Sequence, residues 1–207
     1  MKENVENLEL SETVFEKGIR LEKEFADYMN SHLGWKRFKI RKQMSSKSNM
    51  AGTNVDVIAE RLNQSESDKF NLVALFYGLV CICTFIYGLT ITETDFVISL
   101  FILLFSIVFA VFGFLFRQTA IERMKEHAWV ECKNLKDKVS IKLIQITIAE
   151  RNAYNESKEK EYRIVETYFV SANGFVETAL KYALDNKVRC FVKSDNSFKE
   201  KKYWDNE

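Results

Sequence analysis

The chain has 207 residues, a formal net charge of +1, two histidines and no proline. This balanced charge excludes a strongly basic protein that coats nucleic acid, so any phosphate-binding surface must be a local cluster of lysines and arginines. The lack of proline and the count of seven glycines exclude collagen-like repeats and long low-complexity linkers. Four scattered cysteines without a C-x-x-C pair predict free thiols and no zinc site.

The first part of the chain predicts one helix followed by two strands, after a polar tail at residues 1–13. Apolar residues recur at helical spacing from Val14 to Leu33, and Gly34 ends the predicted helix. Alternating side chains predict strands over residues 35–40 and 54–62, joined by a polar turn.

The centre of the chain holds two uncharged, apolar runs, at residues 70–91 and 96–116. A helix of about 21 residues is about 31 Å long, which matches the hydrocarbon thickness of a bilayer. The alternative is a pair of buried core helices, but a domain of this size has no room to enclose two helices that are apolar all round. The runs therefore predict a transmembrane helical hairpin at residues 70–116.

The charges beside the hairpin predict its orientation. The connector at residues 92–95 is short, so both polar parts of the chain are expected on the same side of the membrane. Lys69, Arg117, Arg123 and Lys125 flank the apolar runs, whereas the connector has no lysine or arginine. By the positive-inside rule we expect a two-pass protein of the inner (cytoplasmic) membrane, with both termini in the cytoplasm.

The remainder of the chain completes an α/β pattern. We expect the domain to be discontinuous, formed by residues 14–69 and 117–195, with a central mixed sheet, flanking helices and a second polar tail at 196–207. The segment 117–127 is expected to continue the second apolar helix. The further predicted elements are a strand at 128–132, a helix at 140–155, a strand at 163–170, a helix at 174–186 and a strand at 188–192.

Three residues in this pattern suggest chemistry. Asp56 lies in the middle of a predicted strand, and Glu131 and Lys133 are two positions apart on another, so that they share one face. Two neighbouring carboxylates repel each other unless a cation lies between them, and oxygen ligands suit Mg²⁺ or Mn²⁺. Such an ion can activate water to attack a phosphodiester. The alternative is a solvated strand edge, because an acid followed downstream by E-x-K also arises by chance.

The surroundings of these residues resemble the Mrr-like restriction endonuclease family, within the PD-(D/E)xK superfamily. The family has a helix with a Phe-Glu pair, a strand with G-x-D, a strand with E-C-K, a helix with a glutamine and a G-F-x-x-x-A-x-x-Y-A helix. This chain has Leu21 before Glu22 where the family has phenylalanine. The matching stretches cover nearly all of the chain outside the apolar hairpin, at residues 18–35, 52–60, 129–134 and 174–191. The resemblance implies a restriction-endonuclease-like fold and Mg²⁺-dependent cleavage of double-stranded DNA.

The resemblance also assigns roles to individual residues. It makes Asp56 and Glu131 the metal ligands and Lys133 the catalytic lysine. The helix glutamate of the family falls on Glu22, with Glu24 as a competitor, and we favour Glu22 because it lies nearer the apolar stripe of its helix. The family's helix glutamine falls on Gln145. For the helix residues, an ordinary polar position is the open alternative.

Two departures from the family pattern are visible. The stretch before Asp56 is less rich in glycine than in the family, and the apolar hairpin is inserted between the second and third predicted strands, where the family has a short turn.

The densest basic cluster is a candidate DNA-binding surface. It comprises Lys36, Arg37, Arg41 and Lys42, with Lys39 and Lys47 nearby. These side chains are suited to DNA phosphates or to anionic lipid headgroups, and a solvated strand and turn is the third reading.

Together these observations predict a membrane-anchored endonuclease, with a role in restriction or defence against phage DNA. Its expected partners are double-stranded DNA and the lipid bilayer. The first alternative is a catalytically idle module of the same fold that binds DNA or acts as a membrane adaptor. The second is a membrane protein whose hairpin is the effector and whose soluble domain is a trigger. A homo-oligomer and a separate protein partner both remain open.

Overall fold

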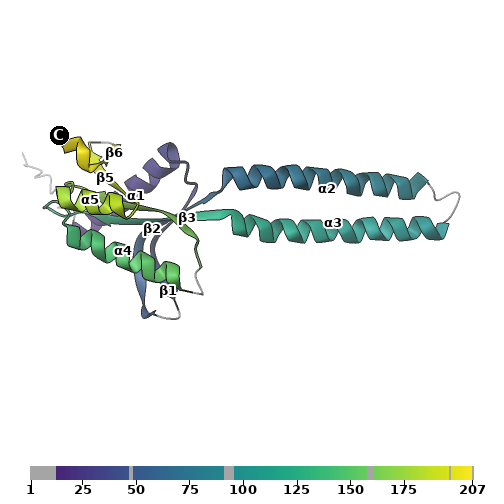
Figure 1. The fold of residues 1–207 in the computed structure, drawn as a ribbon, viewed down its shortest axis with the longest axis horizontal. Helices are drawn as coiled ribbons and strands as arrows, with labels where there is room; N and C mark the ends of the chain where they lie inside the picture. Colours follow the sequence, from purple (N-terminus) through teal and green to yellow (C-terminus); the bar gives the residue numbers. More distant parts are fainter. Residues whose placement is uncertain (1–12, 47–48, 91–95, 158–160, 196, 207) are drawn as a thin grey trace, which may run out of the picture. The chain divides into compact units, whose positions relative to one another are not determined.

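The computed structural model describes residues 13–46, 49–90, 96–157, 161–195 and 197–206. The chain divides into two compact units, one formed by residues up to 61 together with those from 127 onward, and the other by residues 62–126. The first unit is a layered α/β structure and the second is a pair of long helices (Figure 1).

The α/β unit is built on one six-stranded mixed sheet with the strand order β1-β2-β3-β4-β5-β6. The pairs β1–β2 and β5–β6 are antiparallel, whereas β3 is parallel to β4 and β4 to β5. The prediction that the two acid-bearing strands, β2 and β3, join one sheet is confirmed. The strands are β1 (Arg37–Ser46), β2 (Asn49–Leu62), β3 (Lys125–Lys133), β4 (Ile164–Ser171), β5 (Val188–Ser194) and β6 (Ser197–Lys201).

Helix α1 (Val14–His32) packs on one face of the sheet. A capping box between Thr13 and Glu16 begins the helix, and Gly34, with a positive φ of 74°, follows its end. Its buried residues Leu21, Phe25 and Met29 recur at helical spacing and pack in one cluster with alternate residues of the sheet strands, including Cys132.

Helices α4 (Ile141–Glu156) and α5 (Glu177–Asp185) pack side by side in a second core cluster that contains the other side chains of β4 and β5, such as Phe169 and Cys190. Alternate side chains of a strand point to opposite faces, so the helices lie in layers on either side of the sheet. The coarse prediction of a mixed α/β sheet with flanking helices is therefore confirmed.

Several predicted boundaries need correction: β2 begins at Asn49 and β3 at Lys125, before the expected residues 54 and 128. Strand β1 begins at Arg37 and continues to Ser46, where we expected a turn, because residues 42–44 pair with 53–55 in an antiparallel hairpin. Helix α5 begins at Glu177 and not at Gly174, because Phe175 forms a parallel bridge with Val139 before the helix starts.

The prediction that residues 196–207 form only a polar tail is wrong. Strand β6 pairs with β5, and a short 3₁₀ helix follows at Tyr203–Asn206. Phe198 packs β6 against the core. Its side chain is 7% exposed, and its ring packs edge-on against the ring of Phe25, with 5.0 Å between the ring centroids. Phe198 is an isolated apolar residue among polar and charged neighbours, so the sequence gives no strand pattern here.

Replacing Phe198 by alanine should therefore destabilise the α/β unit. Truncating a buried phenylalanine costs about 3–5 kcal/mol through lost apolar burial and the cavity left behind. Heat or urea unfolding of the detergent-solubilised protein, followed by circular dichroism, will measure the change. Leu184→Ala, at a position that is 42% exposed, is the control and should have a much smaller effect. An unfolding midpoint unchanged by Phe198→Ala would show that β6 contributes little.

The second unit consists of α2 (Gln64–Thr90) and α3 (Phe96–Met124), which pack side by side (Figure 1). The expectation that the second helix continues beyond residue 116 is confirmed as far as Met124, after which β3 begins. At the open end of the pair, Asn63 donates a backbone hydrogen bond to Met124 O at 3.0 Å and a side-chain one to Glu126 Oε1 at 2.8 Å.

Polar and small residues lie where the two helices touch each other. Ser99 donates to the Gly88 carbonyl oxygen at 2.6 Å, and Ser106 donates to Thr84 at 3.0 Å. Gly113 is required for close packing, because a Cβ there would collide with the Tyr77 ring. Such contacts are typical of helix pairs in lipid, where burial of apolar surface does not drive association.

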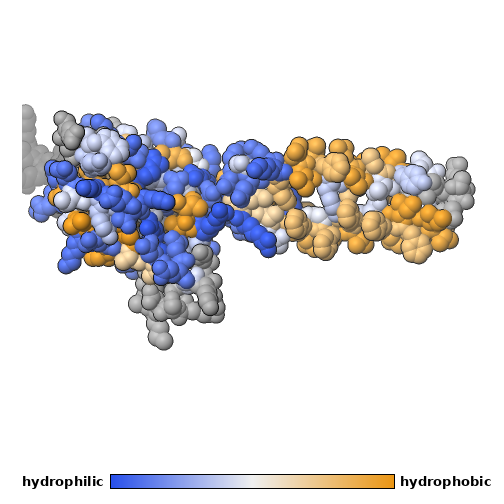
Figure 2. All heavy atoms as spheres, in the orientation of Figure 1, coloured by the Kyte–Doolittle hydropathy of each residue, from blue (hydrophilic) through white to orange (hydrophobic). Residues whose placement is uncertain are grey.

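Outside that contact, hydrophobic side chains cover most of both helices on the face shown in Figure 2. Their outward residues include large apolar side chains that are more than half exposed, such as Phe76, Phe101 and Phe112. Both helices are long and apolar enough to cross a membrane.

Candidate active site

The candidate site begins with Asp56, on β2 between the buried residues Val55 and Val57. Its Oδ2 accepts a hydrogen bond from the backbone N–H of Cys132 on β3 at 2.8 Å. A side-chain carboxylate thus bonds to the backbone of the neighbouring strand at this point. The predicted juxtaposition of Asp56 with the E-C-K strand is present in the structure.

Glu131 and Lys133 lie beside this contact. Both point to the sheet face opposite Cys132, which packs in the core cluster under α1. The Lys133 ammonium donates a short hydrogen bond to Oε1 of Glu131. The other carboxylate oxygen of Glu131, Oε2, is buried and has no hydrogen-bond partner among the residues described. A buried carboxylate oxygen without a partner marks a place where a cation or water would be stabilised.

The electrostatics of these groups show how closely they interact. Burial, and then the negative charge of Asp56, raise the pKa of Glu131 to about 7, although Lys133 opposes this shift. Burial lowers the pKa of Lys133, but the charge of Glu131 and its hydrogen bond outweigh burial, so that the Lys133 pKa rises above its ordinary value. Lys133 is therefore an ammonium at neutral pH, which suits it to donate protons and to neutralise charge.

Glu22 lies on α1, on the face of the sheet that carries Cys132. It is only 2% exposed, and Arg41 on β1 donates to its two oxygens at 3.0 and 2.8 Å. Arg41 adopts a positive φ of 54°, which is uncommon for a residue with a side chain. After burial, the charges of Asp56, Glu22 and Glu131 all raise the pKa of the Cys132 thiol, so the three carboxylates lie around Cys132.

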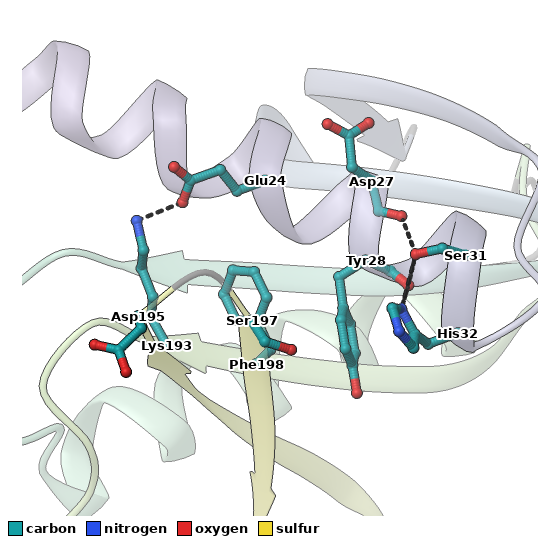
Figure 3. A pocket seen from close by; sticks show the side chains of 9 residues that line it. All are labelled: Glu24, Asp27, Tyr28, Ser31, His32, Lys193, Asp195, Ser197 and Phe198. Atoms are coloured by element: carbon teal, nitrogen blue, oxygen red, sulfur yellow. Dashed lines mark hydrogen bonds and ion pairs between the residues drawn. The ribbon is translucent and has the colours of Figure 1, made fainter.

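Glu24 points elsewhere. It forms an ion pair with Lys193 of β5 at 2.5 Å, and it lines a surface pocket of about 370 Å³ beside α1, β5 and β6 (Figure 3). Tyr28 and His32 line the same pocket, with their rings stacked at 4.5 Å. Of the two helix glutamates, Glu22 is thus the one that lies near Asp56 and Cys132.

The structure does not bring Gln145 to these residues. Gln145 is exposed on α4, whereas Ile144, Thr147 and Ile148 form the buried side of that helix. The resemblance suggested a site glutamine at this position, but in this chain its side chain faces solvent.

The predicted basic cluster is largely occupied by internal ion pairs. Arg37 pairs with Glu60 at 3.1 Å, Lys42 with Glu161 at 3.7 Å, and Arg41 with Glu22. Lys36 is exposed, and Lys47 lies outside the described residues. The cluster therefore offers fewer free cations to a phosphate backbone than its sequence suggests.

A second set of lysines, which was not among the predicted site residues, lies closer to the candidate site along the chain. They are Lys136, Lys138 and Lys142, in the loop after β3 and the first turn of α4. All three are exposed, and none forms an ion pair within the described ranges. The run K-D-K-V-S-I-K was the available signal, because it follows the E-C-K strand directly.

The residues present fit a hard divalent cation. Asp56 and Glu131 supply carboxylate oxygens, one of them without a hydrogen-bond partner in the described part of the chain. Over the residues that the structure describes, no three Asp, Glu, His or Cys side chains are close enough to coordinate one ion directly. A site with only two carboxylates is still compatible with Mg²⁺, because this ion usually keeps several waters and binds through one or two carboxylates.

No family model, curated protein or solved structure matches this chain.

Proposed function

We propose that the protein is a membrane-anchored, Mg²⁺-dependent endodeoxyribonuclease with a restriction-endonuclease-like fold. The observation that carries the proposal is the cluster of Asp56, Glu131 and Lys133 at the junction of β2 and β3, with one Glu131 oxygen buried and lacking a hydrogen-bond partner among the described residues. Two carboxylates and an ammonium side by side are suited to metal-assisted phosphodiester hydrolysis, because the carboxylates can bind the ion and the ammonium can offset developing negative charge.

Each residue has a separate task in this proposal. Asp56 and Glu131 would hold Mg²⁺, or Mn²⁺ in its place, and when bound the ion would supply an activated water and offset charge on the reacting phosphate. Lys133 orients the water and neutralises negative charge as it develops, since its raised pKa keeps it protonated. Glu22 fixes Arg41, whose charge acts on Asp56, and thereby supports the site from the α1 side.

Double-stranded DNA is the proposed substrate. Lys136, Lys138 and Lys142 supply exposed cations within nine residues of Lys133, and contacts to phosphates provide affinity that does not depend on base sequence. A role in restriction or phage defence is consistent with such an activity.

The proposal is tested by incubating the detergent-purified, full-length protein with supercoiled plasmid and Mg²⁺ or Mn²⁺. Nicked or linear products that disappear on chelation with EDTA are expected. Wild-type protein that is inert on DNA and RNA with both ions would argue against an enzyme.

We further propose that α2 and α3 cross the inner membrane and leave the α/β unit in the cytoplasm. The support is the one-sided placement of Lys69, Arg117, Arg123 and Lys125 around the apolar helices. The hairpin thus anchors a nuclease on the side of the membrane where the cell's DNA and any injected DNA are found.

Cysteine labelling in intact cells should reveal this orientation. In a protein whose four native cysteines are replaced by alanine, a membrane-impermeant maleimide should label a cysteine at Thr90, the last residue of α2, and should not label one at Asp185, exposed at the end of α5. Labelling at Asp185 but not at Thr90 would mean the opposite orientation, which places the site away from cytoplasmic DNA.

One observation favours the second candidate function, an idle module that binds DNA or acts as a membrane adaptor. Lys133 is bonded to Glu131, and most of the basic cluster on β1 is bonded to internal acids. Such ion pairs would stabilise the folded domain even if it has no catalytic activity. DNA binding without cleavage in the plasmid experiment would support this candidate.

A further inference from the structure

Helix α4 carries an acidic residue that neither the sequence pattern nor the family resemblance assigns. Glu150 is partly buried, and in the described part of the chain it forms no ion pair. The neighbouring side chain, Arg151, instead turns to β4 and the end of α5, where it donates to Thr167 at 3.4 Å and to the Asn186 carbonyl at 3.2 Å.

The packing of α4 on β3 places Glu150 over the candidate site. Because β3 and β4 are parallel neighbours joined through α4, the helix must run back antiparallel to β3. The register is fixed by Tyr154, whose ring contacts that of Trp129 at 6.1 Å.

One turn back along α4, from Tyr154 to Glu150, is about 6 Å. Two residues forward along β3, from Trp129 to Glu131 on the same face, are about 6.6 Å. Glu150 therefore lies beside Glu131 when positions are compared along the direction of β3. The electrostatics agree with this register: the Glu150 charge contributes to the raised pKa of Glu131, and Lys133 lowers the pKa of Glu150 against the dominant effect of burial.

The geometry points to Glu150 as the third carboxylate of this site, binding a hydrated divalent cation through water together with Asp56 and Glu131. This inference rests on the proposed function, because it concerns the same cation. Binding through water fits both the retained waters of Mg²⁺ and the lack of three directly coordinating side chains among the described residues. Glu150 also offers Lys133 a second acidic neighbour when a cation occupies Glu131.

The test measures cation binding without nucleic acid. Full-length, detergent-solubilised protein is titrated with Mn²⁺, and the free ion is followed by its electron paramagnetic resonance signal. Glu150→Gln should weaken Mn²⁺ binding about tenfold or more, the usual cost of losing an outer-shell partner of a metal. Glu156→Gln removes the same charge from an exposed position of the same helix and should keep the wild-type affinity.

The results separate this inference from the proposed nuclease activity. Wild-type affinity in Glu150→Gln, equal weakening in Glu156→Gln, or no Mn²⁺ binding by the wild-type protein would each overturn the role of Glu150. If Glu150→Gln binds Mn²⁺ normally while the wild type cleaves plasmid, the nuclease proposal stands without it. If Glu150→Gln binds Mn²⁺ weakly while the wild type cleaves no nucleic acid, the cation site stands and the nuclease proposal fails.

Discussion

Replacing Lys133 by alanine is expected to reduce Mg²⁺-dependent DNA cleavage by about 10²–10⁴-fold, the usual contribution of a positioned proton donor or acceptor. The ammonium lies against Glu131 and stays protonated at neutral pH. Its removal takes away a positive charge that would stabilise the transition state, whereas both carboxylates proposed to bind the metal remain. Binding of Mn²⁺ and of DNA should therefore persist, and plasmid nicking rates beside gel-shift and Mn²⁺ titrations will separate the two effects.

Cys132→Ala is the matched control for this experiment. Cys132 is adjacent to Lys133 in the chain, but its side chain lies in the core cluster under α1, on the opposite face of β3. The control should lower stability through lost packing and leave the cleavage rate of folded protein near that of the wild type. Cleavage by Lys133→Ala at the wild-type rate would remove Lys133 from the mechanism.

Patterns within a few residues of one another made much of the architecture predictable. The two uncharged runs specify α2 and α3, because each run is long enough and apolar enough to form a single long helix. Glu131 and Lys133 were expected on one face because the side-chain period of a strand is two, and the structure places them in contact. Asp56 was expected beside them, and it bonds to the strand that carries them.

Contacts between distant residues were not predictable in the same way. The pairing of Arg41 with Glu22 depends on a strand that continues past the expected turn and on a residue with positive φ. A strand-period pattern gives no sign of either feature. The basic cluster on β1 therefore looked free in the sequence and is mostly paired in the structure.

Two polar residues of α4, Gln145 and Glu150, illustrate the same limit. Gln145 and Glu150 are five positions apart, which is about 140° around a helix, so at most one of them can face a given strand. The family pattern pointed to Gln145, which is exposed, whereas the contact between Tyr154 and Trp129 sets the position of α4 on β3. From this contact we infer that Glu150 faces β3. That contact joins residues 25 positions apart, and no local pattern encodes it.

Replacing Glu131 by glutamine should have opposite effects on activity and on stability. Cleavage should fall by about 10²-fold or more, since the site loses a carboxylate that is proposed to hold the ion. This is the scale of losing one electrostatic contact to a transition state. The metal-free protein should become more stable at pH 8, because the wild-type side chain must carry a buried charge there, beside Asp56.

The pH dependence of unfolding gives this prediction its sign. Burial and Asp56 raise the pKa of Glu131 in the folded protein from 4.5 to about 7, so between these values the folded state binds more protons than the unfolded state. The free energy of unfolding of the wild type therefore falls as pH rises through this window, and Glu131→Gln should not show that loss. Heat unfolding at pH 5 and pH 8 in EDTA will measure the difference between the two proteins.

Mg²⁺ should restore stability to the wild type at pH 8 by binding its charged carboxylates, and should do much less for Glu131→Gln. Equal pH dependence in both proteins would show that ionising Glu131 does not destabilise the folded protein. That result would contradict the proposed cation site at Glu131.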